Sequence, residues 1–519
     1  MDRKEAIAEV TKYGGYWDII IVGGGATGLG TAVDAAARGY KTLLLEQHDF
    51  SKGTSSRSTK LVHGGVRYLR QGNISLVLEA LHERGLLAQN APHLVHNQSF
   101  IVPIYDWWEG PFYGIGLKVY DKLAGKLGIQ PSERLSREET LERIPTVEPE
   151  GLRGGVIYYD GQFDDSRLAI DLARTAVAQG GTMLNYMRVE GLIKTGGMVS
   201  GVRVRDLETD TVHQINGRSV VNATGVFADQ LLKMDDRDAK PIVTASQGTH
   251  VILDKEFLQG DTAIMVPQTT DGRVLFAVPW HDRVVVGTTD VEVDEPSLEP
   301  QPLSEEVDFI LANAARYMAR DPERSDVLSA FAGLRPLVSV ADEGDTSKLS
   351  RDHTVLVSAS GLVTVTGGKW TTYRKMAEDV VNQAILVAGL VAKPCTTETL
   401  RIHGWLKQID PDDPLYVYGS DIPEIRRIGE KKKALTEYLH ENLPLSGVRV
   451  VWAVQNEMAR TVEDVLARRT RSLLLDARAS IEVAPQVAKI MAKHLRKSRK
   501  WQKQQVEEYT ALAKRYILE

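Results

Sequence analysis

The chain has 519 residues, a formal net charge of −6 at pH 7 and a single cysteine, Cys395. This length leaves room for about two or three domains with a large buried core. The acidic balance gives no general reason to expect nucleic acid as a partner. One cysteine excludes an internal disulfide, a cysteine zinc cluster and a redox pair, and it fits a reducing cytoplasm. We predict no metal site.

The first ten residues, MDRKEAIAEV, mix acidic and basic residues with apolar ones. We therefore expect no signal peptide, because charges interrupt any apolar core. No uninterrupted apolar run in the chain is long enough to span a bilayer. Together with the cysteine content, these features predict a cytoplasmic protein.

Residues 17–46 have the pattern of a dinucleotide-binding βαβ unit, WDIIIVGGGATGLGTAVDAAARGYKTLLLE. Its β-branched start predicts a strand buried on both faces of a parallel sheet. Gly23, Gly25 and Gly28 follow with the G-x-G-x-x-G spacing. These glycines allow a tight turn, a close approach of the backbone to a pyrophosphate, and packing of the helix on the strand.

The second half of the unit supports the same interpretation. The alanine-rich segment 31–38 predicts a helix whose first turn faces the phosphates, where unpaired N–H groups favour an anion. Residues 41–46 predict the next strand, which ends at Glu46. This carboxylate lies 18 residues after Gly28, close to the spacing of the acid that binds the ribose hydroxyls.

The segment 53–70, GTSSRSTKLVHGGVRYLR, is rich in small hydroxyl residues and glycine. Such a loop can wrap a pyrophosphate and the edge of a flavin, which favours FAD over NAD. A solvated Ser/Thr loop is the alternative that composition alone leaves open.

The run TSSRSTKLVHGGVRYL at 54–69 resembles the flavin-contacting loop of FAD-dependent glycerol-3-phosphate dehydrogenases, a branch of the D-amino-acid-oxidase-like flavoproteins. Further similar motifs follow in the family's order and cover nearly the whole chain. They are VNATGVFAD at 221–229, QGTHVIL at 247–253, VPWHDRVVVGTTD at 278–290, GLRPLV at 333–338, SRDHT at 350–354, TGGKWTTYRKMAED at 366–379 and EMARTVEDVLARRTRSLLLDA at 457–477.

The positions of these motifs predict an α/β fold with interleaved domains. We expect a Rossmann-like FAD-binding domain, a substrate-binding domain with an antiparallel sheet, and a C-terminal helical domain. The expected ranges are 1–98, 151–238 and 355–390 for the first, 99–150 and 239–354 for the second, and 391–519 for the third. In the last domain, 457–476 and 487–518 have a helical pattern.

The resemblance also implies which residues hold FAD. Most of them lie in the glycine turn, the hydroxyl loop and the late GGKW turn. They are Gly23, Gly25, Ala26, Thr27, Gly28, Glu46, Thr54, Ser55, Ser56, Ser58, Lys60, Leu61, His63, Val189, Ala223, Gly225, Gly368, Lys369, Trp370 and Thr371.

For the substrate, the resemblance implies a small phosphorylated alcohol, glycerol 3-phosphate, surrounded by cations. A phosphomonoester suits the planar fork of arginine. Taken singly, each of these residues is more typical of a solvated surface or an ordinary strand. The implied substrate-binding residues are Arg67, Tyr68, His250, Arg335, Arg351 and Lys369.

The implied reaction sends a hydride from the carbinol carbon to the flavin, while a nearby base accepts the hydroxyl proton. His250 is our first choice for this base, because an unperturbed imidazole titrates near neutrality. Arg335 and Arg351 would grip the phosphate or polarise the oxygen. Lys369 would neutralise the reduced flavin or the phosphate, so His250, Arg335 and Lys369 form the predicted catalytic set.

The electron acceptor is a separate question. The resemblance implies a dehydrogenase that passes electrons to a membrane quinone, with an oxygen-using oxidase as the alternative. The family's oxidases commonly carry an extra insertion, which has no clear counterpart here. An NAD-dependent dehydrogenase, a non-catalytic FAD protein and a tRNA-modifying FAD protein also share parts of this pattern.

Two segments raise the question of peripheral contact with an anionic membrane, on the inner face of the cytoplasmic membrane. Residues 100–127 are rich in aromatic residues, and residues 489–503 are rich in Lys and Arg beside Trp501. Both patterns suit an interfacial helix. A packed aromatic cluster and a solvated helix face are the alternatives. The resemblance is also compatible with a homodimer.

Overall fold

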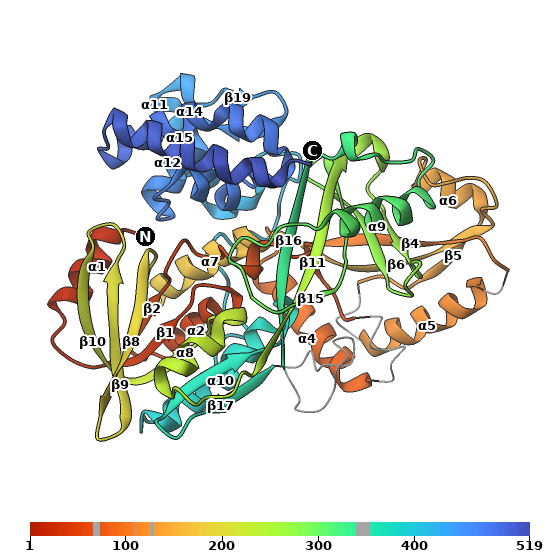
Figure 1. Cartoon of the computed structure of the whole chain (residues 1–519). Helices are drawn as coiled ribbons and strands as arrows, with labels where there is room; N and C mark the ends of the chain where they lie inside the picture. The colour runs from red at the N-terminus through yellow and green to blue at the C-terminus, as the bar shows by residue number, and fades with distance from the viewer. Residues whose placement is uncertain (66–72, 108, 125–128, 339–352, 519) are drawn as a thin grey trace.

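The computed structural model describes residues 1–65, 73–107, 109–124, 129–338 and 353–518 (Figure 1). Two large sheets lie side by side, and a group of helices from the C-terminal part of the chain packs above them. This α/β architecture with a C-terminal helical domain agrees with the fold class expected from the sequence.

The first sheet is built around the predicted βαβ unit. Strand β1 (Trp17–Val22) pairs in parallel with β2 (Thr42–Leu45) on one side and with β10 (Thr211–Asn222) on the other. Outside these, β7 (Thr182–Leu184) pairs in parallel with β2, and β18 (Leu362–Thr366) with β10. The sheet is completed by β8 (Met187–Thr195), β9 (Met198–Asp206) and the antiparallel edge strand β17 (Thr354–Val357).

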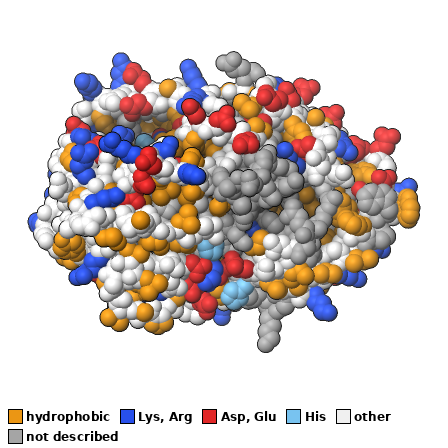
Figure 2. Space-filling model, turned by 60° about the horizontal axis from the view of Figure 1, so that its bottom comes forward, with side chains coloured by type: hydrophobic (Ala, Val, Ile, Leu, Met, Phe, Trp, Pro, Cys, Tyr) orange, Lys and Arg blue, Asp and Glu red, His pale blue; other side chains and the backbone are white. Residues whose placement is uncertain are grey.

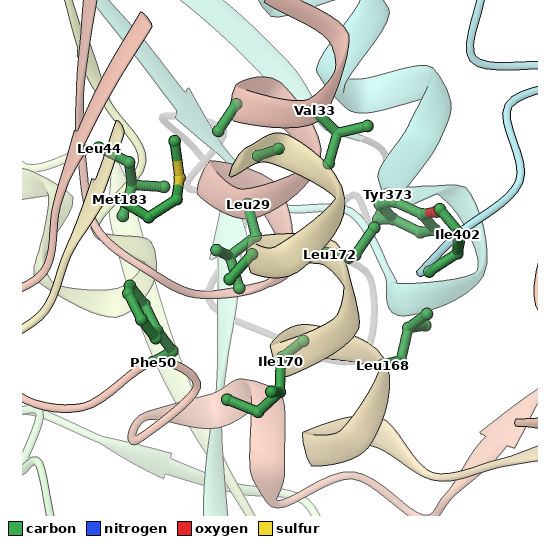
Figure 3. Packing of buried hydrophobic residues seen from close by; sticks show 14 of the residues in the cluster. Leu29, Val33, Leu44, Phe50, Leu168, Ile170, Leu172, Met183, Tyr373 and Ile402 are labelled. Atoms are coloured by element: carbon green, nitrogen blue, oxygen red, sulfur yellow. The ribbon is translucent and has the colours of Figure 1, made fainter. Parts of the chain in front are cut away.

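Three helices cover the parallel part of this sheet: α2 (Ala26–Ala37), α7 (Asp165–Ala178) and α10 (Tyr373–Val387). The helices pack through one buried hydrophobic cluster, part of which Figure 3 shows; it includes Leu29 of α2, Leu44 of β2 and Leu172 of α7. At Gly30 a Cβ atom would lie 2.8 Å from Cδ2 of Tyr373. The absence of a side chain at Gly30 therefore lets α10 approach α2 closely.

The second sheet is mainly antiparallel, with β12 and β4 pairing in parallel. Its central pairs are β4 with β6 and β11 with β16. The strands are β3 (Leu61–Val62), β4 (Val95–Ile104), β5 (Glu133–Leu135), β6 (Gly154–Phe163), β11 (Val243–Asp254), β12 (Ala263–Val266), β13 (Leu275–Trp280), β14 (Arg283–Gly287), β15 (Val291–Val293) and β16 (Ser329–Val338).

The strand pairing differs from the domain ranges expected from the sequence. The expected boundary at 98/99 falls inside β4, and β6 belongs to the second sheet although we expected 151–238 in the FAD-binding domain. The physical reason is that β4 and β6 pair along ten residues, so both strands must belong to the same sheet.

The remaining helices flank the sheets or form the C-terminal domain. Those beside the sheets are α1 (Arg3–Lys12), α4 (Ile74–Asn90), α5 (Glu109–Ala124), α6 (Arg137–Arg143), α8 (Ala228–Asp235) and α9 (Ser304–Ala315). The C-terminal domain contains α11 (Ile422–Lys431), α12 (Gly447–Asn456), α13 (Ser472–Leu475), α14 (Ala477–Leu495), α15 (Arg499–Ala513) and the hairpin β19 (Tyr438–His440) and β20 (Leu443–Ser446).

Both helical stretches expected in the C-terminal domain are interrupted. Within 457–476 a π-helical segment, Asp464–Arg469, is followed by Arg471 in a left-handed conformation with φ of 58°. Arg496, with φ of 54°, separates α14 from α15, and Ser498 caps the start of α15. Hydrophobic periodicity does not reveal such breaks, because the apolar face continues on both sides of them. No helix in the described part of the chain is both long and apolar enough to cross a membrane.

Candidate active site

A cavity of about 410 Å³ lies between the two sheets, a size typical of a ligand pocket. The first sheet contributes the glycine turn after β1, the loop after β2, residues 223–227 after β10 and residues 367–371 after β18. The second sheet contributes Gly248 and His250 of β11 and Gly333 and Arg335 of β16. The carboxyl ends of the parallel strands therefore face the antiparallel sheet across the cavity.

The glycine turn has the shape of a pyrophosphate cradle. At Gly23, with φ of +111°, a Cβ atom would lie 2.5 Å from the carbonyl oxygen of Ala223. A Cβ at Gly28 would lie 1.9 Å from the carbonyl oxygen of Gly23, so only glycine permits this packing of helix on turn. Gly25 precedes α2 without a side-chain cap, and the Ala26 N–H donates to Ser55 Oγ at 2.9 Å. The positive end of the α2 dipole thus opens onto the cavity.

Glu46 is held at the cavity wall by two backbone groups. Its Oε2 accepts the Gly24 N–H at 2.7 Å, and its Oε1 accepts the His48 N–H at 2.8 Å. Burial raises the pKa of Glu46, and the two N–H groups oppose this effect. The carboxylate is therefore fixed where it can accept hydrogen bonds from a diol beside the glycine turn.

The hydroxyl loop that follows Glu46 is tied to both sheets. The Thr54 hydroxyl donates to the carbonyl oxygen of Leu334 on β16 at 2.6 Å. Trp370 Nε1–H donates to the Ser55 carbonyl oxygen at 2.9 Å, and the Ser58 hydroxyl donates to Asp165 Oδ2 at 2.7 Å. The loop is thus an ordered wall of the cavity rather than a solvated Ser/Thr segment.

Most of the predicted cofactor residues line the cavity, namely Gly23, Gly25, Ala26, Thr27, Glu46, Thr54, Ser55, Ser58, Leu61, His63, Val189, Ala223, Gly225, Gly368, Lys369, Trp370 and Thr371. Gly28, Ser56 and Lys60 lie outside its wall. The Lys60 side chain is fully buried, with Nζ 2.6 Å from Asp165 Oδ2 and 2.7 Å from the Ser56 carbonyl oxygen. The Lys60 ammonium thus supports the loop from the side away from the cavity, where Asp165 balances its charge.

His250 lies on the opposite wall as a buried, neutral imidazole. Its Nε2 is 2.9 Å from the Thr59 hydroxyl, and its ring stacks on Phe331 with a centroid distance of 4.9 Å. Its Nδ1 is enclosed and has no hydrogen-bond partner among the described residues. Burial, followed by the charges of Arg335 and Lys60, holds the pKa of His250 well below its usual value. The ring is therefore unprotonated at neutral pH.

The Arg335 guanidinium is held in place by backbone and side-chain oxygens of the second sheet and the residues that follow β14. Its Nη2 donates to Thr288 Oγ1 and to the Thr289 carbonyl oxygen, both at 3.1 Å, and its Nη1 is 3.5 Å from Asp290 Oδ1. A Cβ at Gly248 would lie 2.3 Å from Nη2. The guanidinium thus occupies the space that the missing side chain of Gly248 leaves open.

The other predicted substrate residues divide into two groups. Lys369 lines the cavity, on the turn before α10. Arg67, Tyr68 and Arg351 lie outside the described residues.

Several residues that shape the cavity were missing from the prediction. Gly24 and Thr59 line it, and both belong to motifs whose neighbours were predicted. Gly248 and Gly287 make room for Arg335 and His250, since a Cβ at Gly287 would lie 2.4 Å from His250 Cδ2. Thr59 and Gly24 had a signal in the sequence, whereas the roles of Gly248 and Gly287 depend on which strands pair.

Comparisons with known proteins agree with this geometry. The family described as FAD dependent oxidoreductase matches residues 18–374, and the C-terminal domain of alpha-glycerophosphate oxidase matches residues 364–505. The mitochondrial glycerol-3-phosphate dehydrogenase of Homo sapiens is 38% identical over 96% of this chain and 73% of its own length. The chain belongs to the FAD-dependent glycerol-3-phosphate dehydrogenase family.

Two other glycerol-3-phosphate dehydrogenases are also similar to this chain. The probable mitochondrial glycerol-3-phosphate dehydrogenase of Caenorhabditis elegans is 40% identical over 97% of this chain and 74% of its own length. The solved structure of glycerol-3-phosphate dehydrogenase from Bacillus halodurans complexed with FAD has a TM-score of 0.80 and 31% identity, and it covers 99% of this chain and 98% of that chain. FAD is the cofactor of this family, and the glycine cradle, Glu46 and the hydroxyl loop fit it.

Proposed function

We propose that this chain oxidises sn-glycerol 3-phosphate to dihydroxyacetone phosphate with FAD. The observation that carries this proposal is the pair of His250 and Arg335 on one wall of the cavity, facing the dinucleotide cradle on the other. A neutral base beside a fixed guanidinium suits an alcohol that carries a phosphate. The names of the relatives in Homo sapiens and Bacillus halodurans support the same substrate.

FAD, when bound, supplies the acceptor for the hydride of the carbinol carbon. In this proposal His250 accepts the hydroxyl proton at Nε2, because that atom contacts Thr59, which itself lines the cavity, whereas Nδ1 is enclosed. Arg335 and Lys369 bind the phosphate. Its negative charge offsets the Arg335 charge that lowers the pKa of His250, so substrate binding makes the imidazole a stronger base.

Arg67, Tyr68 and Arg351 complete the proposed substrate site on the strength of the family motifs. The domain division also stays a proposal. The strand pairing supports assigning the whole of β4, which the predicted boundary divides, and β6 to the substrate-binding domain, with 391–519 as the C-terminal domain.

We propose a quinone as the electron acceptor, with oxygen as the alternative. The test is to compare turnover of glycerol 3-phosphate with a soluble quinone analogue against peroxide formation in air. Turnover with the quinone without matching peroxide supports the dehydrogenase. Stoichiometric peroxide in the absence of quinone would identify an oxidase instead.

We further propose that α5 makes peripheral contact with an anionic membrane on the inner face of the cytoplasmic membrane. Phe112, Ile115 and Val119 recur along one side of α5 and are 53%, 66% and 46% exposed. Lys118 and Lys122 are also exposed on this helix. This combination of an apolar stripe and lysines is typical of an interfacial helix. On the face in Figure 2, hydrophobic side chains are visible on the right, where α5 lies in Figure 1.

The basic segment 489–503 lies elsewhere, on α14 and α15 at the far side of the molecule from α5 (Figure 1). Flotation on vesicles of anionic lipid therefore separates the two candidates. Ile115→Asp should abolish binding at low salt while Lys500→Glu should preserve it, and the reverse result would move the contact to the C-terminal helices. We also propose a homodimer on the strength of the family resemblance, which sedimentation of the purified protein tests.

A further inference from the structure

Residues 46–58 form a loop with one side on the cavity and the other on the C-terminal helical domain. We refer to it as the cofactor loop. Its cavity side includes Glu46, Gln47, Ser51, Lys52, Gly53, Thr54, Ser55, Arg57 and Ser58. Its far side makes charged contacts with residues that follow much later in the chain.

Asp49 is the central contact of the far side and is fully buried. Arg469 binds it with two hydrogen bonds, Nη1 to Oδ2 at 2.6 Å and Nη2 to Oδ1 at 2.8 Å. Arg468 Nε donates to the same Oδ2 at 2.6 Å. Burial alone would raise the pKa of Asp49, but the two guanidinium groups hold it well below its usual range. The carboxylate is therefore ionised and doubly clamped at the end of the π-helical segment.

Two further ion pairs attach the later part of the cofactor loop. Lys52 Nζ lies 2.8 Å from Oε2 of Glu463, which directly precedes the π-helical segment. Arg57 Nη2 lies 2.5 Å from Glu299 Oε2 and 3.2 Å from the hydroxyl of Tyr516. The loop is thus held by charged contacts at three points, Asp49, Lys52 and Arg57.

Asp49 is linked to the cofactor side by a very short path. The His48 N–H donates to Glu46 Oε1 at 2.8 Å, and the Ser51 N–H donates to the Gly24 carbonyl oxygen at 2.8 Å. Residues on either side of Asp49 therefore bond directly to the predicted ribose acceptor and to the glycine turn. A displacement of Asp49 must therefore move Glu46, the glycine turn, or both.

We propose that Arg468 and Arg469 are positioning residues for FAD, through which the C-terminal domain holds the cofactor loop in its binding geometry. This inference rests on the proposed placement of the adenosine ribose at Glu46. It assigns the C-terminal domain a role in cofactor retention rather than in the reaction itself, since neither arginine lines the cavity.

Arg469→Gln tests the proposal, with Arg460→Gln as the matched control. Arg460 lies in the same domain and also makes a two-pronged ion pair, Nε to Oε1 at 2.6 Å and Nη2 to Oε2 at 2.7 Å, but its partner is Glu208 rather than the cofactor loop. For each full-length variant we would measure the FAD dissociation constant of the apoprotein, its urea midpoint, and the hydrogen exchange of residues 46–58.

We expect Arg469→Gln to raise the FAD dissociation constant by about tenfold or more, the scale of a lost charge-assisted hydrogen bond. Amides of residues 46–58 should exchange faster in the apoprotein, while Arg460→Gln changes neither quantity. Asp49→Asn combined with Arg469→Gln should be no worse than the single variants, because both remove the same contact.

Equal FAD affinities for Arg469→Gln and Arg460→Gln would overturn the proposal. If Arg469→Gln fails to fold, Arg468→Lys, which keeps the charge but shortens the donor to Asp49, gives a smaller change of the same sign, and an unchanged affinity there would also overturn the proposal. Glu46→Gln distinguishes failure of this inference from failure of the proposed ribose placement. Weakened FAD binding in Glu46→Gln with normal binding in the clamp variants refutes only this inference, whereas normal binding in Glu46→Gln refutes the ribose placement beneath it.

Discussion

Replacing His250 by asparagine tests the proposed proton acceptor. Asparagine keeps a polar group within reach of Thr59 but removes the base. General-base catalysis contributes roughly 100- to 10,000-fold to a rate. Because burial and Arg335 lower the pKa of His250, its imidazole is a weaker base than free histidine. We therefore expect the lower part of this range, about 100- to 1,000-fold, or about 3 to 4 kcal/mol in the barrier.

The assay is the rate at which glycerol 3-phosphate reduces the flavin of His250→Asn in an anaerobic stopped-flow experiment. FAD content and its visible spectrum should stay normal, because His250 lies across the cavity from the glycine cradle. Phe331→Leu is the control, since it removes the stacked ring and leaves the base, and it should cost less than about tenfold in rate. Near-normal flavin reduction in His250→Asn would remove this histidine from the mechanism.

Three further changes probe the glycine contacts and the buried charges. Gly248→Ala should raise the KM for glycerol 3-phosphate about tenfold or more, because the new Cβ would lie 2.3 Å from Arg335 Nη2 and displace the guanidinium. The FAD content should stay normal. An unchanged KM would show that Arg335 does not bind the substrate. Gly28→Ala should lose FAD, since its Cβ would lie 1.9 Å from the Gly23 carbonyl oxygen. Gly116→Ala in α5 is the control and should bind FAD normally, because no atom lies within 4 Å of its added Cβ. Retention of FAD by both variants would argue against the tight glycine turn. Burial and Lys52 lower the pKa of His48 to about 4, so below about pH 6.5 the unfolded chain binds a proton there that the folded protein does not. The free energy of unfolding therefore decreases as the pH is lowered, by up to about 1.4 kcal/mol per pH unit. Urea unfolding between pH 7 and 5 should be less pH-dependent in His48→Asn, and identical slopes for the two proteins would contradict this origin.

Most residues predicted for the cofactor side line one cavity, and the sequence brings them together because they are local. The glycines, the start of α2 and Glu46 lie within one βαβ unit, and hydrophobic pattern and spacing suffice to place them. The hydroxyl loop follows directly. The buried position of the Lys60 side chain has no local signal in the sequence, because its partner, Asp165, lies 105 residues further along the chain.

The opposite wall depended on the family motifs rather than on local pattern. His250 and Arg335 meet because β11 and β16 pair in antiparallel register, which no short-range signal encodes. The contacts of Arg468 and Arg469 with Asp49 are even harder to predict from the sequence, since these arginines follow Asp49 by 419 and 420 residues. Arginines in a charged helical segment are usually solvated, so their burial becomes apparent only in the folded chain.

Local sequence pattern also does not show which sheet β4 and β6 join. Domain boundaries were drawn from the positions of cofactor motifs, and β6 lies between two of them in sequence. The strand pairing instead joins β6 to β4 in the second sheet. Interleaved domains therefore resist division by motif position.

The central claim is that one cavity holds FAD against a site for a phosphorylated alcohol. Anaerobic addition of sn-glycerol 3-phosphate to the purified, FAD-loaded protein tests it most directly. We predict that the visible flavin absorbance is bleached and that dihydroxyacetone phosphate forms in equal amount. An absorbance that stays unchanged with glycerol 3-phosphate, in a sample that dithionite bleaches fully, would contradict the claim.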